Sequence, residues 1–258
     1  MSTLRLKESL FELPSQGQHD LGVPLIGDSQ VRIRPLLKGD QKAISAPGAS
    51  NYQVLYSLLD RVIVEPRLDL DRMLLADCVA VLFAVRLMSF GAHYPIRYQC
   101  DNCEEFVEIS VNLLESEVRY AEDRDTFEVR DLEVTLSTGA VVTYHLPTLG
   151  DEKAIAAQVK NLAKRGDKSN PKYNEQLARI TQLCNHVSSL SGDDQPFVQR
   201  MKFFDEELTM ADERKIWKAV YDSDLGLVPE SEHTCPHCSY DNTVLLNIDQ
   251  SFFRPSDE

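Results

Sequence analysis

The chain has 258 residues, of which 43% are hydrophobic, and its formal net charge is −14 at pH 7. This composition is enough to bury one large core or two modest ones. The negative charge argues against a protein whose main partner is nucleic acid, because binding to phosphates requires a basic face. The longest apolar-rich run, residues 73–90, is interrupted by Asp77 and Arg86, so it indicates a buried helix rather than a membrane span.

The first third of the chain predicts turns followed by helices. Residues 1–50 are rich in turn signals and contain one alternating segment, 30–35, which predicts a short strand. A short helix is expected over 38–45. Residues 51–92 form a helical segment, with one helix predicted over 52–64 and a stronger one over 69–90, which would begin at Asp69 or Asp71 and end at Gly91.

The rest of the chain mixes hairpins with helices. The segments 93–114 and 230–258 each contain a cysteine pair, with alternating residues on both sides of the first pair and at 241–248 after the second. A turn at Gly139 joins two alternating runs over 126–146. Further helices are predicted over 151–164, 172–189, 195–204 and 209–222. We therefore expect an α+β fold in which β-hairpin zinc knuckles combine with a helical core and an additional β-hairpin. The expected organisation is one interlocked unit, 1–258, made of the segments 1–50, 51–92, 93–114, 115–229 and 230–258.

The two cysteine pairs are the most specific motif in the chain. They read Cys100-Asp-Asn-Cys103 and Cys235-Pro-His-Cys238, and each lies where an alternating segment turns back on itself. A strand, a CxxC turn and a returning strand form a metal knuckle, and two knuckles supply the four thiolates of a tetrahedral zinc site. The sequence therefore predicts one structural zinc ion bound by Cys100, Cys103, Cys235 and Cys238. A shell of four cysteines leaves no open position for catalysis.

Other interpretations of these residues remain open at this stage. His237 or the nearby His233 could replace one cysteine ligand, and the two pairs could be unrelated thiols or a site that has lost its metal. The six cysteines fit a reducing cytoplasm, and the N-terminal residues lack the apolar core expected of a signal peptide. Cys78 and Cys184 lie in helical patterns and are expected to be small buried hydrophobic residues.

The sequence contains no recognisable catalytic set. A nucleobase deaminase would have proline before its CxxC pair and an upstream His-x-Glu, but Thr234 precedes Cys235 and no His-x-Glu occurs. P-loop, dinucleotide-binding, nucleophile-elbow and zincin motifs are also missing from the sequence. The remaining histidines are isolated along the chain and are expected to be structural or surface residues: His19, His93, His145 and His186. We therefore expect a protein that is not an enzyme.

An ordered series of short motifs spans nearly the whole chain. The series comprises Leu13-Pro-Ser-Gln-Gly17, Ile33-Arg-Pro35, Asp71-Arg-Met-Leu-Leu-Ala-Asp77, Arg86-Leu-Met-Ser-Phe-Gly91, the two CxxC pairs, and Phe252-Phe-Arg-Pro255. In this order the motifs resemble those of the zinc-knuckle baseplate hub proteins of T4-like contractile-tailed phages. The chain departs from that pattern at 18–20, where Gln-His-Asp replaces the usual aromatic residue.

This resemblance implies a non-enzymatic tail protein that takes part in forming the central baseplate hub. Its expected partners are baseplate hub and other tail proteins, with self-association as an option, and neither nucleic acid nor membrane is expected. The expected location is the virion baseplate, or the host cytoplasm during assembly. A zinc-ribbon nucleic-acid-binding regulator and a metal-dependent hydrolase are the alternatives. Phe252 and Phe253 are expected to pack on the core, whereas Leu13–Gly17 could pack there or contact a neighbouring protein.

Overall fold

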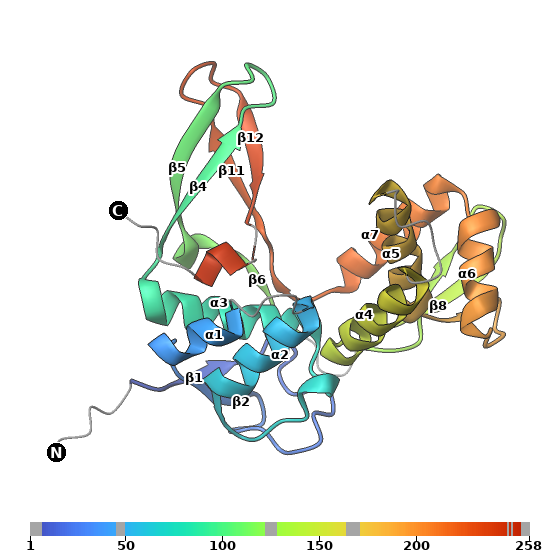
Figure 1. The fold of residues 1–258 in the computed structure, drawn as a ribbon, viewed down its shortest axis with the longest axis horizontal. Helices are drawn as coiled ribbons and strands as arrows, with labels where there is room; N and C mark the ends of the chain where they lie inside the picture. Colours follow the sequence, from blue (N-terminus) through green and yellow to red (C-terminus); the bar gives the residue numbers. More distant parts are fainter. Residues whose placement is uncertain are drawn as a thin grey trace.

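The computed structural model describes residues 7–44, 50–121, 128–163, 171–246, 248 and 250–253. Helices and short antiparallel sheets occur together in these residues, so the expected α+β class is confirmed. The chain forms a first core around one central helix, a pair of hairpins that project from this core, and a second lobe beside it (Figure 1). Within the described ranges, no helix is both long enough and apolar enough to span a membrane.

The first core packs three helices against a small antiparallel sheet. Its elements are β1 (Ser9–Glu12), β2 (Gln30–Ile33), β3 (Ile63–Glu65), α1 (Gln41–Ile44), α2 (Asn51–Val62) and α3 (Leu75–Phe90), and the strands are ordered β1–β2–β3. α3 is apolar on nearly all of its faces, as expected for a helix surrounded by protein. As the sequence predicted, Gly91 ends α3 with a φ of 82°, and its N–H donates to the Leu87 carbonyl at 3.0 Å.

α3 begins later than the sequence predicted. Asp69 does not start it: Leu70–Arg72 form a separate 3-10 turn, η2, and the α-helix begins at Leu75. Before that residue, Leu74 forms an isolated β-bridge with Thr148, and the Leu75 N–H donates to the carbonyl preceding Thr148 at 2.8 Å. The prediction was wrong at this point because a distant loop pairs with the backbone that would have formed the first helical turn.

α2 follows its local signals closely. Ser50 and Gln53 form a capping box, in which the Ser50 N–H donates to Gln53 Oε1 at 2.9 Å. The helix expected over 52–64 ends at Val62 because the next residues pair with β2 as the strand β3. β1, which the sequence did not predict, pairs with the other edge of β2.

Two antiparallel hairpins project side by side from the first core (Figure 1). They are β4 (His93–Gln99) with β5 (Phe106–Asn112), and β11 (Glu230–Thr234) with β12 (Asp241–Leu245); together we call them the arm. Among the described strands, these two hairpins form separate two-stranded sheets with no backbone ladder between them. Isolated hairpins are marginally stable in water, so side-chain interactions must hold the two together.

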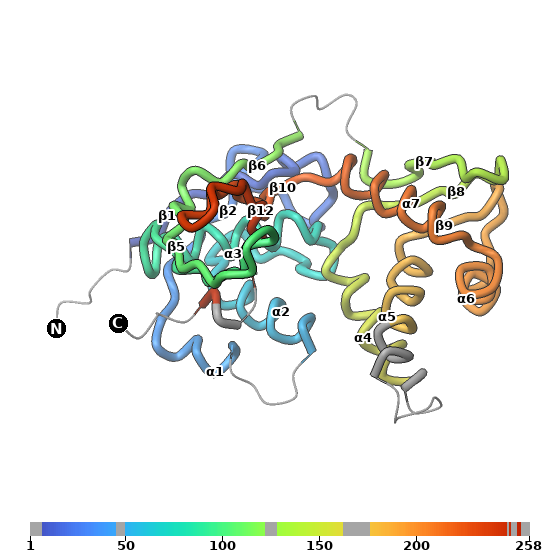
Figure 2. Tube along the Cα trace, turned by 90° about the horizontal axis from the view of Figure 1, so that it is seen from above, coloured from blue at the N-terminus to red at the C-terminus, as the bar shows by residue number. Residues whose placement is uncertain are grey.

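The second lobe has its own sheet and its own hydrophobic core. Its elements are β7 (Leu132–Thr135), β8 (Val141–Tyr144), β9 (Val187–Leu190), α4 (Leu149–Ala163), α5 (Pro171–His186), α6 (Phe197–Glu206) and α7 (Met210–Ser223). The expected hairpin over 126–146 is present as β7 and β8, except that 122–127 lie outside the described residues. The helix expected over 172–189 ends at His186, because the following residues pair with the free edge of β8. Viewed from above, β7–β9 and α6 lie on the side of this lobe away from the first core (Figure 2).

The chain enters and leaves the second lobe at nearly the same place. β6 (Val118–Arg119), reached through the 3-10 turn η3 (Leu113–Glu115), pairs with β10 (Gly226–Leu227) in an antiparallel bridge between the entering and leaving segments. Gly150, in the first turn of α4, approaches η2 so closely that a Cβ there would lie 2.7 Å from the Asp71 carbonyl oxygen. An ion pair between Lys153 and Asp71 adds to this junction.

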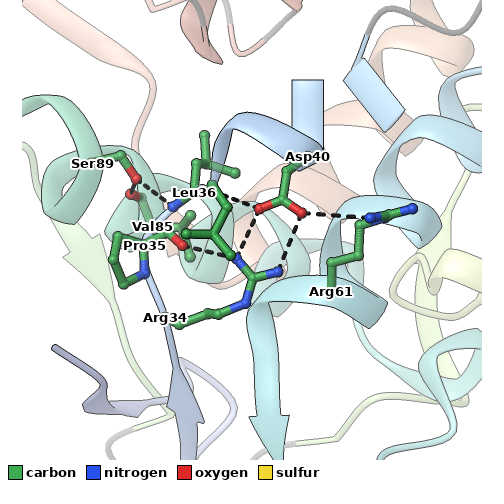
Figure 3. A network of polar contacts seen from close by, with 8 residues as sticks. Arg34, Pro35, Leu36, Asp40, Arg61, Val85 and Ser89 are labelled. Carbon is green, nitrogen blue, oxygen red and sulfur yellow. Dashed lines mark hydrogen bonds and ion pairs between the residues drawn. The ribbon is translucent and has the colours of Figure 1, made fainter. Parts of the chain in front are cut away.

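A buried polar network joins the segment after β2 to α2 and α3 (Figure 3). Asp40, at the end of the 3-10 turn η1 (Lys38–Asp40), accepts a hydrogen bond from Arg34 Nη1 at 2.8 Å. Arg61 of α2 approaches the other carboxylate oxygen of Asp40 at 3.6 Å. Leu36 donates its N–H to Ser89 Oγ of α3 at 2.8 Å, so this loop is bonded to both helices.

The end of the chain closes the first core. Phe252 lies in the 3-10 turn η4 (Gln250–Phe253) and is fully buried, and Phe253 is nearly so. The ring of Phe252 stacks on Phe83 at 6.0 Å between centroids and meets Tyr94 edge-on at 5.0 Å. The expected packing of these two phenylalanines on the core is therefore confirmed.

Candidate metal centre

The four predicted ligands lie in the two turns at the tip of the arm. Cys100 and Cys103 follow β4, and Cys235 and Cys238 follow β11. Both turns have the same backbone pattern. The first cysteine of each pair donates its N–H to the residue five positions later, at 2.9 Å to Glu105 O in one turn and 2.8 Å to the equivalent oxygen in the other.

A left-handed residue completes each turn at the same position. Glu104 and Ser239 lie four residues after Cys100 and Cys235, and their φ angles are 60° and 59°. Each donates its N–H to the carbonyl of that first cysteine at 2.9 Å. Neither is glycine, so both turns hold an ordinary residue in a sparsely populated conformation. The two CxxC turns are therefore local copies of one another.

The structure brings all four sulfur atoms together. The Sγ atoms of Cys100, Cys103, Cys235 and Cys238 all lie within 4.8 Å of one another. Cys100 Sγ is 3.7 Å from Cys238 Sγ, and Cys103 Sγ is 3.8 Å from Cys235 Sγ. A tetrahedral zinc site with the usual Zn–S bond has sulfur–sulfur edges of about 3.8 Å, whereas a disulfide bond needs about 2.05 Å. The donor set therefore fits a zinc ion, and none of these cysteines is in a disulfide.

A buried asparagine links the two CxxC turns. Asn242 of β12 accepts the Asp101 N–H at 3.0 Å and donates to the Tyr240 carbonyl at 3.0 Å. Such contacts orient the turns that carry metal ligands. Sequence reasoning missed Asn242, although a signal was present. It occupies an inward position of β12, in the same alternation as the buried Val244 and Leu246.

Hydrogen bonds and neighbouring thiols shift the pKa values of Cys100, Cys103 and Cys238 in different directions. The backbone N–H of Cys103 is the main cause that lowers the pKa of the Cys100 thiol to about 6. The Glu105 N–H lowers the pKa of Cys103, but burial and the neighbouring thiols outweigh it and raise that pKa to about 12. The side chain of Asn102 lowers the pKa of Cys238. Four sulfurs this close repel one another as thiolates unless a cation lies among them.

The other candidate ligands lie elsewhere. His237 is exposed, and His233 Nε2 lies 3.0 Å from Ser231 Oγ within its own hairpin. Neither histidine belongs to the sulfur cluster. Cys78 and Cys184 are fully buried, as expected for small hydrophobic residues.

Two histidines that looked isolated in the sequence are not isolated in the fold. His145 and His186 come together with Asp151 in the second lobe, where one ligand atom from each lies within 4.8 Å of the others. The sequence contains no sign of this cluster, because the three positions come from different parts of the chain and meet only where β8, α4 and α5 pack together.

The motifs at the start of the chain pack on the first core. Ser15 donates its N–H to Asp77 Oδ1 at 2.9 Å and its hydroxyl to Oδ2 at 2.6 Å. Leu13 is fully buried. Of the two alternatives for the opening turn, packing on the core is thus the one observed.

The motif at the end of α3 contacts the end of the chain. Arg86 Nη1 donates to the Gly91 carbonyl at 2.9 Å, and its guanidinium lies 5.7 Å from the centre of the Phe252 ring. Short motifs that are distant in the sequence therefore meet in one core, where they position backbone and fill space.

Comparison with known proteins gives one match. No curated protein and no solved structure matches the chain significantly. The profile of the family described as T4 bacteriophage base plate protein matches residues 8–254, which is nearly the whole chain. This match confirms the resemblance to T4-like baseplate proteins and indicates a structural role in a phage tail baseplate. The chain belongs to the T4 bacteriophage base plate protein family.

Proposed function

We propose that this protein takes part in forming the central hub of a contractile-tail baseplate through protein–protein contacts, without enzymatic activity. The family match over residues 8–254 carries the proposal, because it includes the first core, the arm and the second lobe. The role in the hub is the finer assignment that the proposal adds to family membership. Its place of action would be the virion baseplate, or the host cytoplasm while the tail is assembled.

One structural zinc ion bound by Cys100, Cys103, Cys235 and Cys238 is part of this proposal. Sulfur–sulfur distances of 3.7 and 3.8 Å support it, and a complete four-thiolate shell is typical of structural rather than catalytic zinc. The ion would join two hairpins that no backbone ladder connects in the described part of the chain. It would thereby bind the middle of the sequence to its end.

In this proposal the chain works as one interlocked unit. Residues 1–114 and 230–258 would build the first core and the arm together, and 115–229 would form an insertion between them. The pairing of β6 with β10 supports this organisation, because it closes the insertion at its base. The burial of Phe252 supports it as well, since the first core is incomplete without the end of the chain.

The proposed contacts are with baseplate hub and other tail proteins. The arm projects from the body (Figure 1) and exposes large apolar side chains on both hairpins, including Phe106, Tyr240 and Leu245. Assembly proteins bury such side chains against their partners. The net charge of −14 disfavours nucleic acid as a partner.

Co-expression with the tail proteins of the same phage, followed by affinity capture in both directions, tests the hub assignment. We expect hub proteins to be captured and the complex to survive gel filtration, whereas self-association alone would give a larger homo-oligomer. A monomer that captures none of the tail proteins would contradict the proposal. Salt-sensitive binding to DNA or RNA would instead favour the nucleic-acid-binding alternative.

The zinc proposal has a separate test. Cys235→Ser should lose one equivalent of zinc in elemental analysis and unfold at a lower temperature than the wild type, because metal binding and folding are coupled. Thr243→Ser, on the exposed side of the same hairpin, is the matched control and should keep its zinc. Freshly purified wild-type protein without metal at this site would refute the assignment, whatever its effect on hub binding.

A further inference from the structure

The cluster of His145, Asp151 and His186 is independent of the sulfur cluster. His145 follows β8 directly, Asp151 lies in the first turn of α4, and His186 is the last residue of α5. One ligand atom from each of the three residues lies within 4.8 Å of the others. Two imidazoles and one carboxylate make up a donor set that binds divalent transition metals such as zinc.

The spacing of two of these atoms, which form a long hydrogen bond, also fits a bound metal ion. His145 Nε2 is 3.3 Å from Asp151 Oδ2. A charge-assisted hydrogen bond is normally about 2.7–2.9 Å long. Two ligands of a tetrahedral ion, with metal–nitrogen and metal–oxygen bonds of the usual length, lie about 3.4 Å apart. The observed distance matches the edge of such a tetrahedron.

His186 supplies an independent observation. It is buried, and its Nδ1 has no hydrogen-bond partner within the described part of the chain. Its ring centroid lies 6.0 Å from that of His145 and 6.0 Å from that of Trp217.

The three residues are held in place by bonds that do not depend on a ligand. The His145 N–H donates to the His186 carbonyl at 2.9 Å, which links the backbones of the two histidines. Asp151 Oδ2 accepts bonds from the Thr148 N–H at 2.8 Å and from its hydroxyl at 2.7 Å. Asp151 thus also caps the start of α4, and this structural role is the simplest alternative explanation for its position.

We propose that His145, Asp151 and His186 bind a divalent transition-metal ion of the zinc class, at a second site with three protein ligands. A fourth position would be open to water or to another ligand. The side chains of His145 and Asp151 are 16% and 20% exposed, so the ion has a path from solvent. Beside this site, the backbone of Thr148 forms a β-bridge with Leu74 of the first core. A bound ion would therefore stiffen the base of the second lobe, where it meets the first core.

Metal titration of the full chain, without a polyhistidine tag, tests this site. Cobalt(II) in a four-thiolate site gives strong sulfur-to-metal charge-transfer bands, whereas cobalt in a histidine–carboxylate site gives only weak d–d bands. We expect wild-type protein to bind two equivalents of zinc or cobalt, of which only one produces charge-transfer bands.

Two variants assign the second equivalent. His145→Gln and Asp151→Asn should each lower the affinity for the second metal ion at least about 100-fold. Changing a residue that only contacts a ligand lowers metal affinity by about 10- to 100-fold, and removing a ligand should cost more. Far-ultraviolet circular dichroism and the fluorescence of Trp217, which packs in the second lobe, would show that both variants are folded. His93→Gln, an exposed histidine at the start of β4, is the matched control and should leave both equivalents unchanged. One equivalent in the wild type, or a second that persists in both variants, would overturn the proposal.

Discussion

Asp40 is the central acceptor of the polar network in Figure 3, and Asp40→Asn tests how far this network stabilises the first core. Its carboxylate accepts hydrogen bonds from Arg34 Nη1 and from the Leu37 N–H, both at 2.8 Å. Both bonds end on Oδ2, so an asparagine oxygen in that position could still accept them. The acceptor that asparagine loses is Oδ1, to which Arg34 Nη2 donates at 3.2 Å. The NH2 group in its place would turn a donor toward the Arg34 guanidinium, so the substitution removes both the charge and an acceptor.

The magnitude follows from the burial of the pair. The Asp40 side chain is 3% exposed and that of Arg34 is 14% exposed, so little water can replace the lost carboxylate. Breaking a buried ion pair by removing one partner costs about 3–5 kcal/mol. Arg34 keeps its bond to the Pro35 carbonyl at 2.9 Å, which places the expected loss near the lower end of that range. We therefore expect Asp40→Asn to reduce the free energy of unfolding by about 3 kcal/mol at pH 7.

The effect should also depend on pH in a defined direction. Burial acts to raise the pKa of Asp40, but bonds from Arg34 and the Leu37 N–H outweigh it and hold this pKa below its ordinary value. A carboxyl group with a depressed folded pKa contributes stability above its unfolded pKa, and loses it as the pH falls through the folded value. The difference between wild type and Asp40→Asn should therefore be complete at pH 7 and shrink in acid.

Urea denaturation followed by far-ultraviolet circular dichroism measures this difference. Fluorescence of the one tryptophan, Trp217, reports separately on the second lobe. Asp60→Asn is the matched control, because its ion pair with Arg67 is exposed on both sides and should contribute less than about 0.5 kcal/mol. If Asp40→Asn were no more destabilising than this control, the buried network would not stabilise the first core as argued.

Two further predictions concern the same core. Phe252→Ala should reduce the free energy of unfolding by about 3–5 kcal/mol, because it leaves a cavity beside Phe83 and Tyr94. Urea denaturation measures this loss, with Leu114→Ala at an exposed site as the control. If the two variants had equally small effects, the prediction would be contradicted. Burial raises the pKa of Asp77 to about 6. The folded chain therefore binds more protons than the unfolded chain between about pH 4 and 6. As a result, the stability of the folded state falls as the pH rises through this window. In Asp77→Asn the side-chain oxygen can still accept from the Ser15 N–H, and the NH2 group can donate to the Ser15 hydroxyl, which reverses the direction of that bond. The variant should gain up to about 3 kcal/mol relative to wild type between pH 4 and 7, whereas parallel pH profiles would argue against a buried acid.

Long periodic segments of this fold were predictable from sequence, whereas the short strands β1, β3 and β9 were not. The apolar run of α3 and the glycine that ends it are local signals, as is the alternation of β4 and β5. β1 and β9 have only four residues each, which is too few for a reliable alternation. Their pairing depends on a strand edge supplied by a distant part of the chain. The late start of α3 has the same cause, since Thr148 pairs with the backbone before it.

The two candidate metal sites differ in predictability for a related reason. In each CxxC pair the two cysteines share a tight turn, so half of the ligand set is fixed by local spacing and the chemistry of thiolates suggests the rest. His145, Asp151 and His186 come from three different elements, and only Asp151 has a local signal, as the partner of Thr148 at the start of α4. The backbone bond between His145 and His186 exists only once β8 and β9 have paired.

The path of the chain explains why the arm matters to the first core. After β5 the chain leaves this core, builds the second lobe around separate apolar side chains, and returns through β10 beside the strand by which it left. Only then does it form the second hairpin and place Phe252 against α3. Contacts between residues so far apart in sequence form slowly, because a long loop must close before they stabilise anything. The four sulfur atoms and the Asn242–Asp101 bond connect the same two distant segments that Phe252 connects at the base of the arm. The tip and the base of the arm therefore support one another, and weakening either should loosen the connection between the first core and the end of the chain.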